Sequence, residues 1–288
     1  MGNIYKKVYN YCIALPGALV YIIIFVIPTF ASFYFSLTRW NLKEADFIRL
    51  DNFKTFLLQP NLKISIANTF IYAFSTSLSK VILGILIAVF LCSGIRSAGY
   101  LKSVLFFPNL LGFVAVGVAF SSLMHPSKGL INMMITSLNG PKINWLTDEN
   151  MAMLSVILVD VWKGIGVSII IYIAGISAIP QSYYEAAVID GASGYQQFRF
   201  ITLPLCLTSI NSVLTLSLIG GLRSYELVWT LTQGGPGYAT EVLGSAVYKL
   251  FANGQYGLST AGNVIIFIIV AVIIFPINTL ISKREEEL

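Results

Sequence analysis

Long apolar segments alternate with shorter polar ones along the whole 288-residue chain. A helix needs about 20 apolar residues to cross the roughly 30 Å hydrocarbon core of a bilayer, and about six segments reach that length. Each should be a helix, because backbone groups in lipid must bond within their own segment, and the alternation of barrel strands is missing. The predicted spans run approximately over Tyr11–Leu37, Ile66–Cys92, Ser103–Met124, Ala152–Ile176, Leu203–Leu222 and Ser259–Ile281.

The composition also indicates a surface that faces lipid. The chain is 56% hydrophobic and 11% charged, whereas soluble domains are roughly 25% charged. Its net charge of +5 comes from scattered residues with no Lys/Arg run longer than two, so nucleic acid is not an expected partner. The apolar stretch after Lys6 and Lys7 is too long for a cleaved signal peptide. We therefore predict an all-α membrane protein whose residues 1–288 form a single transmembrane domain, with membrane lipid around it.

The side chains that carry most enzyme chemistry are sparse. Cys12, Cys92 and Cys206 are widely spaced, and His125 is the one histidine, so neither a disulfide framework nor a metal site is expected. There is also no G-x-x-x-x-G-K-[ST] phosphate-binding loop. We expect no catalytic residue, no metal ligand and no cofactor in this chain.

The polar stretch between the fourth and fifth spans, residues 180–200, predicts two short helices. Pro180 should end the fourth span, because it disfavours helical geometry for the residue before it. Ser182 with Glu185 has the spacing of a capping box, which would begin a short helix. Gly191 can take the left-handed conformation that ends such a helix, and Ser193–Gln196 repeats the capping-box pattern. Such a helix could dock on a partner or lie on the lipid headgroups, and these physical arguments leave both options open.

The same stretch resembles the EAA loop of ABC importer permeases. The family pattern is EAA, a glycine a few residues later and then I-x-L-P. Every part is present, in Glu185-Ala186-Ala187, Asp190-Gly191-Ala192 and Ile201-Thr202-Leu203-Pro204. In that family the loop is cytoplasmic, and its short helix fits a cleft on an ATP-binding subunit. The resemblance implies that the residues coupled to the ATPase here are Tyr184, Glu185, Ala186, Ala187, Asp190 and Gly191.

Orientation follows from this resemblance, because the charges do not supply it. Cytoplasmic termini would place seven basic residues inside and eight outside, so the positive-inside rule is silent. With a cytoplasmic EAA loop and an even number of spans, both termini would be cytoplasmic, in a bacterial plasma (inner) membrane.

A second resemblance narrows the expected substrate. Leu231-Thr232-Gln233-Gly234-Gly235-Pro236, followed by Thr240-Glu241 and Tyr248, is similar to the loop before the last span of carbohydrate importer permeases. The similarity is to the maltose, glycerol-phosphate and multiple-sugar type, in the half related to the larger maltose permease subunit. It implies the type I importer permease fold and a sugar or oligosaccharide substrate. The implied partners are a second homologous permease subunit (a heterodimer), a cytoplasmic ABC ATPase dimer that binds ATP and Mg, and an extracytoplasmic sugar-binding protein.

Ionisable and aromatic residues within the spans suggest a path for the substrate. Charges inside a membrane usually face a bundle interior or water. Asp160 and Lys163 are three residues apart, so we expect them to pair on one helix face, either as a structural pair or along the path. Aromatic residues near Tyr225 could instead mark the membrane interface. The candidate path residues are Asp160, Trp162, Lys163, Tyr172, Asn211 and Tyr225.

Two other functions compete with the importer interpretation. A secondary transporter or channel not coupled to ATP could use Asp160 as an ion-coupling carboxylate, and its uptake would persist without ATP. A membrane enzyme would need a Ser-His, Cys-His or metal constellation, which the sequence does not offer. Neither alternative explains why the chain carries an EAA loop.

Overall fold

The computed structural model describes residues 14–285, which divide into two compact units. Within the described residues, the first unit comprises 14–59 and 247–265, and the second comprises 60–246 and 266–285. The predicted single domain over residues 1–288 stays a prediction. Residues 11–13 of the predicted first span lie outside the described residues.

The first unit contains the first apolar helix and a small polar cap. Helices α2 (Leu15–Tyr21), η2 (Ile22–Val26) and α3 (Ile27–Ser36) follow one another without a break and form one span-length helix. The strands β1 (Thr38–Trp40) and β2 (Ala45–Phe47) then form an antiparallel hairpin, followed by α4 (Asp51–Leu58). The buried Asn52 side chain joins these elements, because its amide donates to the carbonyl oxygens of Ser36 and Thr38 at 2.9 and 2.8 Å.

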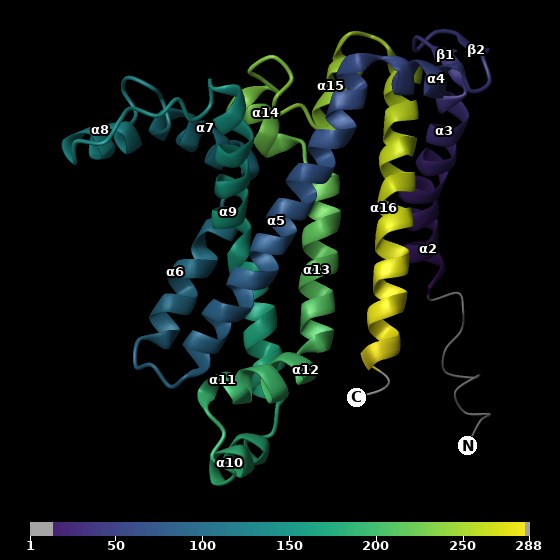
Figure 1. The fold of residues 1–288 in the computed structure, drawn as a ribbon. Coiled ribbons are helices and arrows are strands. Elements are labelled where there is room, and N and C mark those ends of the chain that lie inside the picture. Colours follow the sequence, from purple (N-terminus) through teal and green to yellow (C-terminus); the bar gives the residue numbers. More distant parts are fainter. Residues whose placement is uncertain (1–13, 286–288) are drawn as a thin grey trace, which may run out of the picture. The chain divides into compact units, whose positions relative to one another are not determined.

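The second unit is a helical bundle around α5 (Pro60–Cys92), α9 (Glu149–Ala178) and α13 (Leu207–Leu222), which pack side by side (Figure 1). Helix α9 begins where the Asp148 carboxylate accepts the backbone N–H groups of Asn150 and Met151 at 2.8 and 3.2 Å. It ends as predicted before Pro180, with Ile179 in an extended conformation. Apolar side chains on facing helices fill the core; the largest fully buried ones include Tyr72, Ile169, Tyr172, Leu218 and Leu222.

Two of the predicted spans are bent rather than straight. The predicted span Ser103–Met124 is divided into α6 (Ala98–Leu110) and α7 (Phe113–Leu123), which meet at 98°. The chain bends there because Leu111 and Gly112 are extended, with ψ of 139° and 145°. The predicted span Leu203–Leu222 bends by 69° at Cys206, between Gly194–Leu205 and α13.

The spans otherwise agree with the predicted number. Among the described residues, four helices are long and apolar enough to cross a membrane, and counting each bent pair as one span gives up to six. Apart from the three-residue strands, the elements are helical. This confirms the predicted all-α membrane fold of about six transmembrane helices.

Shorter elements connect these helices at the two ends of the second unit. Helix α14 (Glu226–Thr232) packs against α7, and α8 (Leu130–Ser137) extends from the same end (Figure 1). The opposite end carries α10 (Gln181–Ile189), α11 (Gly194–Gln197), η3 (Phe198–Thr202) and α12 (Leu203–Leu205). The last two helices, α15 (Leu243–Ala252) and α16 (Tyr256–Glu285), each have residues in both units.

Candidate functional site

The helix predicted within the 180–200 loop is present as α10, but its start differs from the prediction. It begins at Gln181 after Pro180, whose carbonyl oxygen accepts the N–H of Tyr183 at 3.2 Å, and no side chain caps it. Ser182 therefore lies inside the helix, and the predicted capping box with Glu185 is wrong. The reason is that the extended Pro180 already turns the chain into the helix two residues earlier.

The end of α10 and the start of α11 follow the prediction. Gly191 has φ of +75°, the left-handed region that glycine enters without a Cβ penalty. The following capping box is complete: the Ser193 N–H donates to Gln196 Oε1 at 2.7 Å, and the Gln196 N–H donates to Ser193 Oγ at 3.3 Å. The loop is thus an ordered helix, a glycine turn and a second helix.

Most of α10 is open to a partner. Of the predicted coupling residues, Glu185, Ala186, Asp190 and Gly191 are exposed, whereas Tyr184 and Ala187 are half-buried. Exposed apolar side chains lie beside them; these are Tyr183, Val188 and Ile189, the last of which is 86% exposed. A helix with this much exposed apolar surface offers a contact for another protein chain.

At the other end of the second unit, the loop that carries Thr232-Gln233-Gly234-Gly235-Pro236 is firmly attached. The hydroxyls of Thr232 and Thr240 lie 2.7 Å apart, and Thr240 also donates to the carbonyl oxygen of Gly235 at 2.7 Å. The first half of α5 also binds this loop through two hydrogen bonds. Asn68 donates to the carbonyl oxygen of Tyr238 at 2.8 Å, and Thr69 Oγ1 accepts the N–H of Leu243 at 2.8 Å.

Between these two ends, a cavity of about 410 Å³ opens into the bundle. Helices α5, α9 and α13, the connection 223–225 and the first residue of α14 supply its polar groups, and α7 supplies the ring of Phe113. The polar and charged side chains that line it are Lys80, Asp160, Ser217, Arg223, Ser224, Tyr225 and Glu226. Such a mixture of hydroxyl, ammonium, guanidinium and carboxylate groups can hydrogen-bond a ligand that has many hydroxyls.

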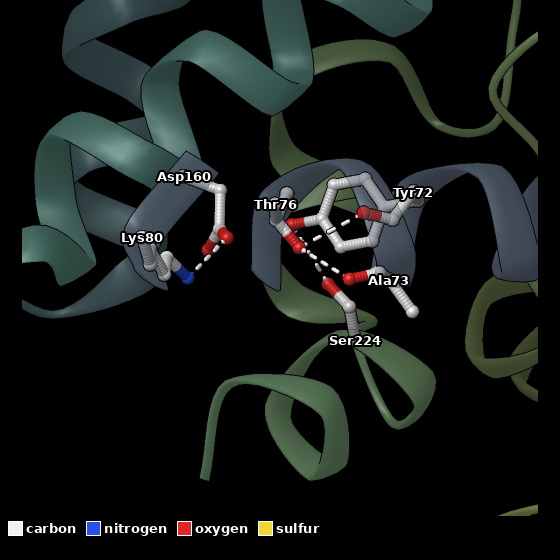
Figure 2. A network of polar contacts seen from close by, with 6 residues as sticks. All are labelled: Tyr72, Ala73, Thr76, Lys80, Asp160 and Ser224. Atoms are coloured by element: carbon white, nitrogen blue, oxygen red, sulfur yellow. Dashed lines mark hydrogen bonds and ion pairs between the residues drawn. The ribbon is translucent and has the colours of Figure 1, made fainter. Parts of the chain in front are cut away.

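An ion pair between α5 and α9, shielded from solvent on most sides, lines this cavity. Lys80 Nζ lies 2.6 Å from Asp160 Oδ2, with side chains 11% and 10% exposed (Figure 2). Gly164 makes room for the lysine, since a Cβ there would lie 2.9 Å from Lys80 Nζ. The predicted pairing of Asp160 with Lys163 is wrong. Helix α5 presents a cation directly to Asp160, and Lys163 instead lies 3.8 Å from the centre of the Phe113 ring.

Hydroxyl groups continue this polar network along α5. Ser224 Oγ donates to the Tyr72 hydroxyl oxygen at 3.2 Å, linking the segment after α13 to α5 (Figure 2). Thr76 Oγ1 donates to the carbonyl oxygens of Tyr72 and Ala73, at 2.8 and 3.2 Å. Each polar group is therefore held in place within the apolar bundle.

The cavity gathers only part of the predicted path. Asp160 and Tyr225 line it. Trp162 is 43% exposed and packs on Phe120, and Tyr172 is fully buried. Asn211 lies one turn before Thr215, whose hydroxyl is 3.4 Å from its Oδ1. Among the residues that line the cavity, Trp162, Lys163, Tyr172 and Asn211 are not found.

Several lining residues were missed when the path was predicted. Lys80 and Arg223 are not among the predicted path residues, although each is a charge in or at the edge of an apolar segment. Ser217, Gly220 and Ser224 have the i, i+3, i+7 spacing that places small residues on one helix face. That spacing is the sequence pattern from which a small-residue face along the cavity could have been predicted. No such pattern points to Glu226, because it lies just beyond the apolar segment.

A helical membrane bundle with an inner polar cavity, an exposed helix at one end and an anchored loop at the other has the features of a permease. The chain belongs to the family of binding-protein-dependent transport system inner membrane components, whose sequence profile matches residues 8–285. It is a membrane-embedded permease subunit of an ABC importer rather than an enzyme. This family assignment sets aside the alternative of a secondary transporter or channel.

Individual relatives cover nearly the whole chain. The trehalose/maltose transport system permease protein of Thermococcus litoralis is 30% identical over 91% of this chain and 89% of its own length. The multiple sugar-binding transport system permease protein of Streptococcus mutans is 29% identical over 99% and 98%. A crystal structure of a bacterial alginate ABC transporter, in complex with an alginate pentasaccharide-bound periplasmic protein, contains a chain with the same fold. Its TM-score is 0.83 at 23% identity, covering 94% of this chain and 92% of that one.

Proposed function

We propose that this permease translocates a sugar or oligosaccharide and that the substrate passes through the cavity around Lys80 and Asp160. The observation that carries the proposal is that cavity: hydroxyl groups, charges of both signs and aromatic edges meet inside an otherwise apolar bundle. Polar groups are costly in a membrane interior unless they have a function there. The names of the relatives, which transport trehalose/maltose and multiple sugars, support a saccharide as the substrate.

The partners follow from the two ends of the second unit. An ABC ATPase dimer, which binds ATP and Mg, would dock on α10 through Glu185, Ala186, Ala187, Asp190 and Gly191. Tyr183, Val188 and Ile189 add exposed apolar surface for this contact. An extracytoplasmic sugar-binding protein would approach the opposite end. A second, homologous permease subunit would complete the path as a heterodimer, because the apolar helices of this chain leave large faces open.

The location and orientation of the chain belong to the same proposal. It would lie in a bacterial plasma (inner) membrane with α10 and both termini on the cytoplasmic side. ATP binding would close the ATPase dimer, move α10 and open the permease outward, and hydrolysis would reverse the change.

The proposal is tested by narrowing the cavity, and Ser224→Ala, which should retain uptake, is the control for loss of the hydrogen bond from Ser224 to Tyr72. Ser224→Leu places a larger side chain at the cavity wall, whereas Ser212→Leu makes the same change on the exposed face of α13. We expect Ser224→Leu to abolish ATP-dependent uptake of labelled mono- and oligosaccharides in vesicles, and Ser212→Leu to retain it. Both variants should insert into the membrane equally well. Full uptake of every transported sugar by Ser224→Leu would contradict this path.

A further inference from the structure

Helix α10 is attached to the rest of its chain by very few contacts. It has no buried residue, and only Tyr184 and Ala187 are half-buried. Among the described residues, the side-chain hydrogen bond from α10 to another element is that of Tyr184, whose hydroxyl lies 2.9 Å from Thr202 Oγ1. Tyr184 therefore faces its own chain, while its neighbour Tyr183 is 54% exposed.

The threonine at the other end of this contact is buried and held in place. Thr202 is 4% exposed, and its hydroxyl also lies 3.5 Å from the carbonyl oxygen of Gln197. A threonine hydroxyl has one proton to donate and two lone pairs that accept. If that proton points to Gln197, then Tyr184 is the donor to Thr202. The Gln197 side chain in turn donates to the carbonyl oxygen of Ala192 at 3.2 Å, so the network returns to the end of α10.

Thr202 lies one helical turn before the point where the fifth span bends. It is the last residue of η3, and its carbonyl oxygen accepts the N–H of Cys206 at 2.9 Å, the residue at the 69° bend. Helix α13 begins at the next residue and forms one wall of the cavity with Leu216, Ser217 and Gly220. A contact that fixes α10 to Thr202 therefore connects α10, through the bend at Cys206, to the helix that forms this wall of the cavity.

The backbone alone would transmit movement poorly. On one side α10 joins α9 through the extended residues Ile179 and Pro180, and on the other it joins α11 through Gly191, with φ of +75°. Without a cross-link, α10 could pivot on these two joints while α13 stayed in place.

We infer that the Tyr184–Thr202 hydrogen bond is the positioning contact that carries movement of α10 to the bend at Cys206 and so to the cavity. Tyr184 then transmits the movement of α10 and is not part of the surface on which the ATPase docks. Thr202 is added to the coupling residues. This inference rests on the proposed function, since it presumes an ATPase that moves α10.

The test compares isosteric variants that remove the hydrogen bond. Tyr184→Phe deletes one partner, Thr202→Val deletes the other together with its contact to Gln197, and their double variant deletes both. Tyr195→Phe, at the 74% exposed tyrosine of α11, is the matched control. Gly220→Cys, at a position with nothing within 4 Å of its Cβ, reports on the cavity. Cys12 and Cys92 are changed to serine, and the 1% exposed Cys206 is retained. The readout is the rate of maleimide labelling in the assembled complex, with and without ATP plus vanadate.

We expect nucleotide to change the labelling rate in the parent complex and in Tyr195→Phe. Tyr184→Phe and Thr202→Val should weaken that response about two- to tenfold, the ratio that one net hydrogen bond supplies. The response of the double variant should be no weaker than that of Thr202→Val alone, because the bond that Tyr184→Phe removes is already absent there. The ATPase should still co-purify with each variant, which separates transmission from docking.

Other outcomes overturn the inference. Variants that respond as Tyr195→Phe does, or two single effects that simply add, would show that this hydrogen bond transmits nothing, while the proposed function stands. Loss of the ATPase from Tyr184→Phe would place Tyr184 in the docking surface instead. A parent complex that does not respond to nucleotide would overturn both the inference and the proposed ATP coupling.

Discussion

The ion pair between Lys80 and Asp160 yields a prediction in which two single substitutions differ in severity. At 2.6 Å, the attraction is about 6 kcal/mol for an effective dielectric constant of about 20. Removing two ions from water costs several kcal/mol for each of them, so the pair adds little net stability. Removing one partner is different, because it leaves an uncompensated charge in the bundle at a cost of about 3–5 kcal/mol.

The identity of the deleted partner matters because a second buried cation lies nearby. Lys163 is 4% exposed, and it interacts electrostatically with Asp160 one turn away on α9. In Lys80→Met, Lys163 can still balance the carboxylate. In Asp160→Asn, Lys80 loses its ion partner, and Lys163 loses the stronger of the two acids that attract it, Asp160 and Glu226. We therefore expect Asp160→Asn to incur the full cost and Lys80→Met clearly less, while the double variant Lys80→Met/Asp160→Leu recovers part of the loss.

The assay is the thermal melting of the purified complex in detergent, measured for the parent and the three variants. We expect the highest melting temperature for the parent, a lower one for Lys80→Met and the lowest for Asp160→Asn. The double variant should melt above Asp160→Asn. If Asp160→Asn melts at or above Lys80→Met, the acid is not the shared counter-ion of two lysines, and the reasoning is refuted.

Three further predictions concern local structure. Gly221→Ala should destabilise the bundle by about 1–3 kcal/mol, because its Cβ would lie 2.7 Å from Ala73 Cα, whereas Gly220→Ala has open space and should be tolerated; melting of the two variants checks this. Gly191→Val should lose uptake and Gly191→Asn should keep most of it, because asparagine tolerates φ of +75° better than a β-branched residue does. Transport assays check this: equal losses of uptake in both variants would show that side-chain size, and not backbone conformation, is what matters at this position. Asn132→Ala should expose the 126–145 segment to protease, since the buried amide bonds Pro126 and Ile143, and resistance equal to the parent would count against this role.

The helices could be predicted from the sequence because a chain that crosses lipid must form its backbone hydrogen bonds internally, which leaves little choice of structure. Span positions, the stop at Pro180 and the turn at Gly191 follow from local chemistry, and they are confirmed. The bends at Gly112 and Cys206 were not predicted, because a straight helix and a bent one have the same apolar sequence pattern. Where a bend occurs depends on packing against other helices.

The candidate site was only partly predictable for a similar reason. The exposed helix that carries Glu185 depends on local sequence, so the motif located it. The ion partner of Asp160 depends on which residue of α5 faces α9, and Lys80 is 80 positions away in the chain. Spacing along one helix suggested Lys163, which is close in sequence, but the interhelical partner is closer in space.

The central claim is that this chain is the permease of an ATP-driven importer and is coupled to its ATPase through α10. Affinity purification of the tagged chain from mildly solubilised membranes, with mass spectrometry of the proteins that accompany it, tests this claim most directly. The account predicts recovery of an ABC ATPase and a second six-span permease, with the ATPase lost when Glu185 and Gly191 are both replaced. Recovery of the chain alone, still able to move solute across liposomes without ATP, would contradict it.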